Sequence, residues 1–397
     1  MVLTDMAKKP RIYFDYNASA PLLDCARDAV IDLLAHAGNA SSVHFEGRNA
    51  RKHIEAARNA LANSIDCNPA NIVFTSGATE AANHVLCPIM RVNGQEVNVS
   101  QLYVASTEHP CILQGGRFRN DEILELPVLE NGIIDLECLE KSLKNHNFET
   151  GLPLVAVQYA NNETGVLQPI SRVSEIVHDN DGLLLVDAVQ ALGKTPILMA
   201  ETGADFLIVS SHKIGGPQGV GALVLANGNV SPSPLITGGG QENYHRAGTE
   251  NVAAIAGFAA AIEWHSENLT KNIQKFELRD SIETGLSTIS REAGNEISAP
   301  VVFGSSVERL GNTSCFSVPG VKAETALVSL DLDGIAVSSG SACSSGKVKK
   351  SHVLDAMGVQ AEEMQGAVRL SLGWDSTDEE AGRFLEAWKK IIGRMVA

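Results

Sequence analysis

Short apolar runs that end in polar or turn residues recur through the first two thirds of the chain. Several of them are followed by stretches with a helical pattern, which is typical of buried strands in a covered, mostly parallel sheet. The runs are NIVFTSGATEAANHVL, LYVASTEHP, LPLVAVQYANNETG, GLLLVDAVQ, DFLIVSSHKIGGP and GALVLAN. The pattern predicts an α/β domain from about residue 21 to residue 265.

A different pattern follows Trp264. Apolar residues recur there at near-helical spacing and predict a linking helix; they are Leu269, Ile273, Phe276, Ile282, Leu286 and Ile289. Beyond it, NTSCFSVPG, IAVSSGS and AVRLSLGW have the composition of strands, and Ser376 with Glu379 predicts a capping box for a closing helix. We therefore expect a second, smaller α+β domain formed by residues 1–20 and 266–397.

Composition narrows the possible functions. The 397-residue chain carries a formal charge of −16, so it lacks the basic surface that binds nucleic acid or anionic membranes. It has no signal-peptide core and no run of 18 apolar residues, which predicts a cytoplasmic protein with a small-molecule or protein partner. Its seven cysteines are scattered without a Cys-x-x-Cys pair, so we expect neither a metal site nor a disulfide framework.

One cysteine has an unusual setting. The stretch SSGSACSSGK, residues 338–347, surrounds Cys343 with glycines and serines that supply neither packing surface nor a fixed backbone. It is not a P-loop, because five residues separate its glycines where that motif has four, and Val348 follows where the motif has Ser or Thr. A lone cysteine is usually a small buried residue. These neighbours instead predict a mobile segment, about residues 338–350, with a reachable thiol.

Two of the predicted strands end next to residues that could take part in catalysis. Ligands of open α/β sheets bind outside the carboxyl ends of the strands; Asp187 ends the run GLLLVD, and Lys213 follows the run DFLIVSSH. Taken singly, Asp187 could cap a helix and Lys213 could be solvated. Together they are the two groups that pyridoxal phosphate requires, a lysine that condenses with its aldehyde and a carboxylate that keeps its pyridine nitrogen protonated.

A phosphate site is predicted where a strand gives way to a helix in TSGATEAAN. Gly77, Ala78 and Thr79 would present backbone N–H groups and the positive end of a helix to an anion, although they could form only a helix cap. Ser210 and His212, at the end of a later strand, could add hydroxyl and imidazole donors. The stretch GGPQGVG does not match G-x-G-x-x-G and gives no support to a dinucleotide site.

Two further residues complete the candidate site. His109, in STEHP, could stack on the cofactor ring and move protons, because imidazole titrates near neutrality; a structural histidine is the alternative. Arg369, in AVRLSLG, has the planar fork that suits an α-carboxylate. Its alternative is an ordinary surface ion pair.

These motifs together resemble those of one family. From about Tyr13 to Gly373, the chain resembles the NifS/IscS-type cysteine desulfurases through SSGSACSSG, SSHKIGGPQGVGAL, NNETG, VDAVQ, TEHP, TSGATEAAN, NASSVHFEGRNAR and HRAGTEN. The resemblance implies a homodimeric, pyridoxal phosphate-dependent transferase of fold type I. Such an enzyme has a large α/β domain, with a mainly parallel sheet flanked by helices, and a smaller α+β domain that carries the cysteine loop.

The resemblance also implies roles for single residues. Lys213 would bond covalently to the cofactor, with Asp187 at its pyridinium nitrogen and His109 stacked on its ring. Other contacts would come from Gln190 and Asn162 to the ring oxygen and the cofactor, from Thr79, Ser210 and His212 to the phosphate, and from Thr249 of the neighbouring subunit to the same phosphate. Arg369, with Asn162, would bind the substrate, and Cys343 would accept sulfur.

The implied reaction converts L-cysteine to L-alanine and leaves sulfur on Cys343 as a persulfide, which passes to an iron–sulfur scaffold or another acceptor protein. The alternatives are a selenocysteine lyase, or an aminotransferase or lyase of the same fold in which Cys343 is incidental. A non-catalytic sulfur scaffold is disfavoured by the Lys213/Asp187 pair and by the lack of clustered cysteines. The sequence departs from the family pattern at Asn243 and Tyr244, where a basic and a small residue are usual, and in the opening FDYNASAP.

Overall fold

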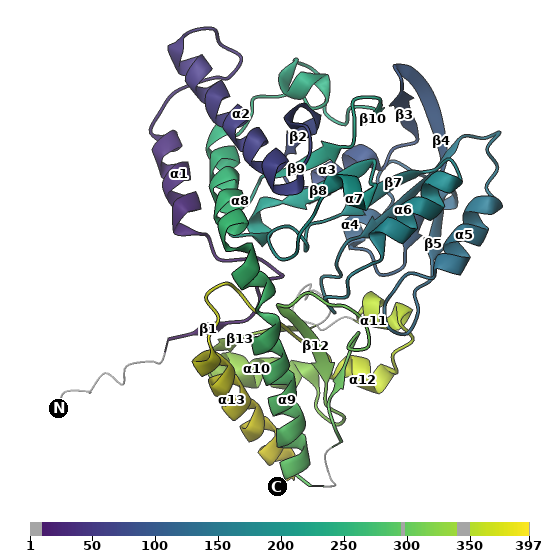
Figure 1. The fold of residues 1–397 in the computed structure, drawn as a ribbon. Coiled ribbons are helices and arrows are strands. Elements are labelled where there is room, and N and C mark those ends of the chain that lie inside the picture. Colours follow the sequence, from purple (N-terminus) through teal and green to yellow (C-terminus); the bar gives the residue numbers. More distant parts are fainter. Residues whose placement is uncertain (1–9, 295–297, 340–349, 397) are drawn as a thin grey trace.

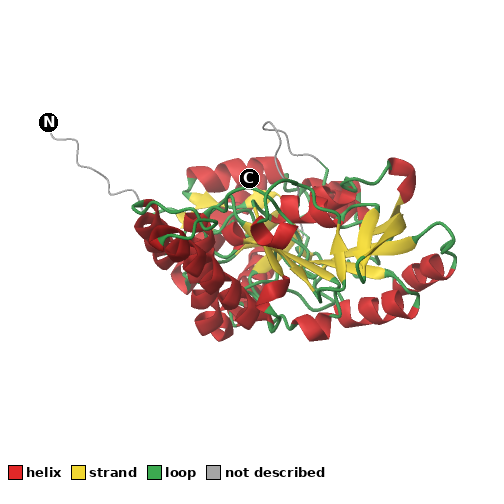
Figure 2. Cartoon of the chain, turned by 90° about the horizontal axis from the view of Figure 1, so that it is seen from above, coloured by secondary structure: helices red, strands yellow, loops and turns green. Residues whose placement is uncertain are grey.

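The computed structural model describes residues 10–294, 298–339 and 350–396. A large sheet with its helices forms the upper part of the molecule in Figure 1, and a small sheet with a bundle of helices forms the lower part. Seen from above, the strands lie between layers of helices (Figure 2). No helix in the described part of the chain is both long enough and apolar enough to cross a membrane.

The helices alternate with strands along most of the large-sheet region. The α-helices of the whole described chain are α1 (Asp24–Leu34), α2 (Phe45–Ile65), α3 (Ala78–Val85), α4 (Pro110–Leu113), α5 (Leu136–Lys144), α6 (Ile170–Asp179), α7 (Met199–Thr202), α8 (Val252–Ile273), α9 (Phe276–Glu292), α10 (Ala323–Leu332), α11 (His352–Ala356), α12 (Ala361–Gln365) and α13 (Asp378–Val396).

Nine strands form the large sheet. They are β2 (Ile72–Thr75), β3 (Ile89–Val92), β4 (Gln95–Ala105), β5 (Ile123–Leu126), β6 (Leu152–Gln158), β7 (Leu183–Asp187), β8 (Phe206–Ser210), β9 (Gly221–Leu225) and β10 (Val230–Pro232). The order is β10-β3-β4-β6-β7-β8-β9-β2, with β5 also paired to β4. The centre, from β4 to β8, is parallel as predicted. Strand β9 runs antiparallel to β8, because a short turn and not a crossover helix joins them.

The central strands are buried on both faces. In β7, Leu184 and Val186 pack into one hydrophobic cluster of the large-sheet region, whereas Leu183 and Leu185 pack into the other. Alternate side chains point to opposite faces of a strand, so a strand covered on both sides must be apolar throughout. This burial explains why GLLLVD reads as a continuous apolar run with its one carboxylate at the end.

The small sheet is antiparallel and has its own core. Its order is β11 (Val301–Val302), β12 (Thr313–Ser317), β15 (Val368–Ser371) and β14 (Ser338–Ser339), and β1 (Ile12–Tyr13) pairs separately with β13 (Ile335–Ala336). The core behind it includes Phe14, Phe316 and Trp388. The strands predicted in NTSCFSVPG, IAVSSGS and AVRLSLGW are confirmed, and the N-terminal segment joins this part of the molecule.

Two local predictions were wrong. The expected linking helix after Trp264 is two helices, α8 and α9, and the backbone at Gly311 packs closely against the break between them: a Cβ there would lie 2.6 Å from the carbonyl oxygen of Ile273. The capping box of α13 is formed by Thr377 and Glu380, one residue later than predicted, through Thr377 N to Glu380 Oε2 at 3.0 Å and Glu380 N to Thr377 Oγ1 at 3.3 Å. Both pairs fit the same four-residue pattern, so the sequence could not separate them.

Candidate active site

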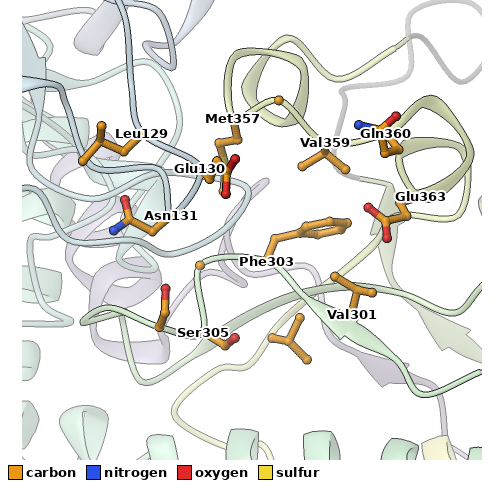
Figure 3. A pocket seen from close by; sticks show the side chains of 14 residues that line it. Leu129, Glu130, Asn131, Val301, Phe303, Ser305, Met357, Val359, Gln360 and Glu363 are labelled. Atoms are coloured by element: carbon orange, nitrogen blue, oxygen red, sulfur yellow. The ribbon is translucent and has the colours of Figure 1, made fainter.

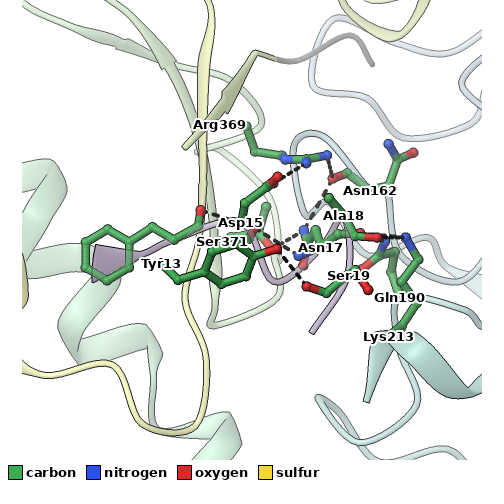
Figure 4. A network of polar contacts seen from close by, with 12 residues as sticks. Tyr13, Asp15, Asn17, Ala18, Ser19, Asn162, Gln190, Lys213, Arg369 and Ser371 are labelled. Atoms are coloured by element: carbon green, nitrogen blue, oxygen red, sulfur yellow. Dashed lines mark hydrogen bonds and ion pairs between the residues drawn. The ribbon is translucent and has the colours of Figure 1, made fainter. Parts of the chain in front are cut away.

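Lys213 and Asp187 meet at the carboxyl ends of β7 and β8. Asp187 is the last residue of β7 and is buried, and its Oδ1 accepts a hydrogen bond from the backbone N–H of Val189 at 2.9 Å. Lys213 lies in the turn after β8, and its Nζ donates to the carbonyl oxygens of Asn17 and Ala18 at 2.7 and 2.8 Å. The N-terminal segment therefore passes directly over the lysine (Figure 4).

Burial shifts both groups away from their ordinary charge states. It raises the pKa of Asp187 to about 6, against the opposing effects of the Val189 N–H and of Lys213. Burial, together with the Arg369 cation, lowers the pKa of Lys213 to about 8. An amine with this pKa is partly uncharged near neutral pH, which is the form that condenses with a carbonyl group.

The start of α3 forms an open anion cradle. Gly77 has φ +152°, a conformation that side-chain-bearing residues rarely adopt, and a Cβ built on it would meet no atom within 4 Å. Thr79 lies in the first turn of this helix, where free N–H groups point outward. The structure thus places Gly77, Ala78 and Thr79 in the strand-to-helix turn that the sequence predicted.

Ser210 and His212 flank the turn that carries Lys213. Ser210 ends β8 and is buried. His212 Nδ1 lies 3.2 Å from Ser19 Oγ, and burial, with Lys213 and Lys194 nearby, lowers the pKa of His212 to about 4. His212 is therefore a neutral imidazole at physiological pH.

His109 caps α4 with its ring. The ring Nδ1 accepts the backbone N–H of Cys111 at 3.2 Å, so its proton resides on Nε2. Burial, with Lys213 and His352, lowers the pKa of His109, which keeps the ring neutral. Sequence reasoning missed Cys111: its Sγ lies 3.0 Å from the same Nδ1, and burial raises its pKa to about 12, so it is a neutral thiol. Its position two residues after His109 was the available signal.

Arg369 brings the small sheet to the same site. It lies in β15 and is buried; its Nη2 donates to Asp15 Oδ1 at 2.7 Å and its Nη1 to the carbonyl oxygen of Asn162 at 3.0 Å. The buried Nε has no hydrogen-bond partner in the described chain. Asp15, which sequence reasoning also missed, is the counter-ion of the predicted carboxylate-binding residue (Figure 4).

Asn17 joins the two halves of the site. Its backbone carbonyl accepts from Lys213 Nζ and from Gln190 Nε2, the latter at 3.0 Å. Its side-chain Nδ2 donates to Thr313 Oγ1 at 2.9 Å and to the Asn162 carbonyl at 3.3 Å. Gln190 and Asn162 thus both belong to the network around the lysine, whereas their contacts with a cofactor stay a prediction, and Asn17 is a central residue that no local motif marked.

Among the described residues, Thr249 has no contact with this network. Cys343 falls outside the described residues. Thr249 is exposed, at the end of a segment that begins with three left-handed residues at φ 44°, 52° and 66°: Glu242, Asn243 and Tyr244. This turn is held in place because Glu242 forms a buried ion pair with Arg58 at 2.9 Å.

A separate cavity of 760 Å³ contains none of the predicted site residues. It opens between β11, the turn at residues 129–131 and the segment from Met357 to Gln360, with Phe303 on its wall (Figure 3). The predicted chemistry therefore gathers at the strand ends and not in this cavity.

Comparison with known proteins agrees with this geometry. Residues 12–384 match the family model Aminotransferase class-V. The cysteine desulfurase IscS of Dictyoglomus turgidum is 37% identical over 395 residues, covering 98% of this chain and 96% of that protein. Cysteine desulfurase IscS 1 of Archaeoglobus fulgidus is 37% identical over 388 residues, covering 96% of this chain and 97% of that protein.

Solved structures show the same relationship. A NifS-like protein from Rickettsia africae superposes with a TM-score of 0.83 at 33% identity, covering 96% of this chain and 99% of the other. A second NifS-like protein gives 0.84 at 32% identity, covering 97% and 100%. The chain belongs to the class-V aminotransferase family and, within it, to the cysteine desulfurases. Pyridoxal phosphate is the general cofactor of this family.

Proposed function

We propose that this chain holds pyridoxal phosphate at Lys213 and converts L-cysteine to L-alanine, with Cys343 as the first sulfur acceptor. One observation carries the proposal: a partly buried lysine with a pKa lowered to about 8 shares one polar network with Arg369, a buried cation suited to a substrate carboxylate. A site that pairs a partly uncharged amine with a carboxylate-binding cation suits an amino-acid substrate.

The residues fit the cofactor. The open cradle at Gly77 offers backbone N–H groups to a phosphate, and Thr79, Ser210 and His212 lie in the neighbouring turns. Asp187 is buried and has one carboxylate oxygen beyond its bond to Val189 to give to a pyridinium N–H. His109 presents a neutral ring, and Gln190 and Asn162 supply polar groups from the turns after β7 and β6.

The cofactor, when bound, supplies an electron sink for the carbanion at the substrate Cα. Lys213 in its free-amine form removes the Cα proton and returns a proton later, a role that its lowered pKa favours. Arg369 holds the substrate carboxylate and so fixes the direction of the Cα–H bond. The neutral His109 carries its proton on Nε2 and lies near enough to Lys213 for that cation to lower its pKa.

The sulfur step needs a thiolate nucleophile. The Cys343 thiolate attacks the substrate Sγ; the new S–S bond forms as the substrate Cβ–Sγ bond breaks, and its electron pair remains on Cβ. A proton then completes the methyl group of alanine, and Cys343 carries a persulfide. Such a persulfide is the form in which sulfur reaches an acceptor protein, for iron–sulfur cluster assembly or another sulfur pathway.

Mutation of Cys343 tests this step. We expect Cys343→Ala to bind pyridoxal phosphate with unchanged visible absorbance but to form no alanine, because the cofactor contacts lie elsewhere. Cys25→Ala is the matched control, since Cys25 is exposed on α1. Mass spectrometry after brief exposure to cysteine should add one sulfur atom to the wild-type Cys343 peptide. Normal alanine production by Cys343→Ala would overturn the role of Cys343 in favour of a lyase that releases sulfur without this thiol.

The proposed homodimer rests on Thr249. It is exposed, and the segment before it is fixed by two ion pairs, Arg58 with Glu242 and Arg246 with Glu80, both at 2.9 Å. An exposed hydroxyl that follows this anchored segment is suited to reach the phosphate of a neighbouring subunit. Sedimentation should give a dimer, and Thr249→Ala should weaken cofactor binding roughly fivefold, as the loss of one hydrogen bond predicts. A fully active monomer would contradict this arrangement.

A further inference from the structure

A second lysine lies beneath the site. Lys194 follows β7 by seven residues, and its Nζ donates to Gln190 Oε1 at 2.6 Å and to Asn17 Oδ1 at 2.9 Å. Among the described residues, no carboxylate forms an ion pair with it. Burial, with Lys213 and Arg369 nearby, lowers its pKa well below the usual value. A buried amine without a counter-ion reduces stability, so its retention calls for a role.

Lys194 fixes which way two amides face. An amine donates protons to both oxygens whether it is charged or neutral, because even the neutral form has two N–H groups. When both oxygens accept from Lys194, as they do here, each amide has its oxygen toward Lys194 and its nitrogen away. The nitrogens do point away: Gln190 Nε2 donates to the Asn17 carbonyl at 3.0 Å, and Asn17 Nδ2 donates to Thr313 Oγ1 at 2.9 Å.

The orientation of Gln190 matters for the site above it. Its Nε2 carries two protons, and the Asn17 carbonyl takes only one of them. The same carbonyl accepts from Lys213 Nζ at 2.7 Å, so the Gln190 nitrogen lies beside the lysine that we propose holds the cofactor. A reversed Gln190 would present an acceptor oxygen at this place instead of a donor.

We propose that Lys194 is a positioning residue that holds Gln190 with its amide nitrogen toward the ring oxygen of the bound cofactor. This inference rests on the proposed function. Lys194 touches neither substrate nor cofactor and acts through Gln190. Its loss allows the Gln190 amide to rotate, which removes a hydrogen-bond donor from the ring oxygen and shifts the protonation equilibrium of the bound chromophore.

The test compares three variants by the pH at which the visible band of the bound cofactor titrates. Lys194→Met has no donor, and Gln190→Leu removes the amide. Each should shift the midpoint in the same direction, by about 0.7 pH units for the loss of one hydrogen bond. The double variant should shift it no further than Gln190→Leu alone, because the two residues act in series. The cofactor dissociation constant should follow the same pattern.

Two controls separate this role from simple stabilisation. Lys144→Met removes an exposed lysine of α5 and should leave the midpoint unchanged. Should Lys194→Met not fold, Lys194→Gln replaces it in the same cycle; its shorter side chain reaches only one of the two oxygens, so we expect a smaller shift in the same direction. A lysine that serves only packing would lower the melting temperature without moving the midpoint.

The outcomes are distinguishable. A Lys194 variant with a wild-type midpoint, or shifts from Lys194→Met and Gln190→Leu that add, would overturn the positioning role while leaving the proposed function intact. A wild-type protein that shows no cofactor band at Lys213 would instead contradict the proposed function itself.

Discussion

The two sides of the site are built in different ways. On the cofactor side, Asp187, Lys213 and the Gly77 cradle each follow directly from a strand of the large sheet. On the substrate side, Arg369 is held by Asp15 and by the Asn162 carbonyl, so that three distant segments of the chain meet there. The cofactor side is therefore fixed by local turns, whereas the substrate side forms only when the N-terminal segment and the small sheet are in place.

This difference separates the residues proposed to bind the cofactor from those proposed to select the substrate. The cofactor groups stand at the strand ends of one sheet, and a change confined to Arg369 or Asp15 should leave cofactor binding intact, although Asn17 of the N-terminal segment also contacts Lys213. The substrate groups depend on long-range contacts, so small changes there should alter substrate affinity before they alter the cofactor. The following predictions test this separation.

The largest effect is expected at Lys213. Lys213→Ala should lose at least roughly 10³-fold in alanine formation, because it removes the proposed proton-transfer group and the covalent link to the cofactor. Borohydride reduction of the wild type followed by peptide mapping should place the pyridoxyl group on Lys213. A pyridoxyl group on Lys194 or any other lysine would show that the cofactor side has been assigned to the wrong strand end.

Arg369 should show the next largest effect, confined to substrate binding. Arg369→Lys keeps a cation beside Asp15 but loses the planar fork, so we expect KM for cysteine to rise roughly tenfold, and roughly 10²-fold in Arg369→Met, with the cofactor still bound in both variants. Steady-state kinetics and visible spectra of the same preparations check both statements. Loss of the cofactor band in Arg369→Lys would mean that the two sides are not separable.

The contrast between the sides also explains what the sequence could predict. The cofactor residues stand at the ends of apolar runs, so strand periodicity and a rule about strand ends locate them without any structure. Asp15 and Arg369 are 354 positions apart, and Lys194 and Asn17 are 177 apart. No local pattern marks such pairs, because their meaning comes from contacts that exist only in the fold.

The same reason accounts for the errors in the fold. The parallel centre of the sheet and the strands of the small sheet follow from local patterns and were predicted correctly. The break between α8 and α9 lies against Gly311 from elsewhere in the chain, and the helical spacing of apolar residues continues across it. The sequence therefore predicts well which segments form helices and strands. It predicts poorly where a helix is interrupted next to backbone from a distant part of the chain.

Glu163 tests the junction between the two sides. It lies in the turn after β6 and accepts a hydrogen bond from Ser351 at the start of α11. Burial raises the pKa of Glu163 to about 7, against the opposing effects of Ser351 and Arg369. The folded state therefore binds this proton more tightly than the unfolded state. The resulting stability is fully present below about pH 4.5, the unfolded value, and is lost as the pH rises through 7.

The matched variant for this junction is Glu163→Gln. Between pH 5 and pH 8, the wild type should lose on the order of 2 kcal/mol more unfolding free energy than Glu163→Gln does, because the amide does not titrate. Urea unfolding of the cofactor-free proteins at the two pH values gives this difference. Parallel pH profiles for the two proteins would show that Glu163 is ionised in the folded state.

The smallest effect is expected at Asp15, and its sign distinguishes charge from geometry. Asp15 neutralises Arg369 in the free enzyme, so it competes with the substrate carboxylate for the same cation. Asp15→Asn keeps an oxygen that accepts from Arg369 Nη2 but removes the charge, and it should lower KM for cysteine about threefold, whereas Asp15→Ala frees the guanidinium to turn and should raise KM about threefold. Both variants lose the Asp15 charge that raises the pKa of Lys213, so that effect cancels between them. Equal decreases in KM would show that Asp15 competes with the substrate without orienting Arg369, and unchanged KM values in both variants would exclude both roles.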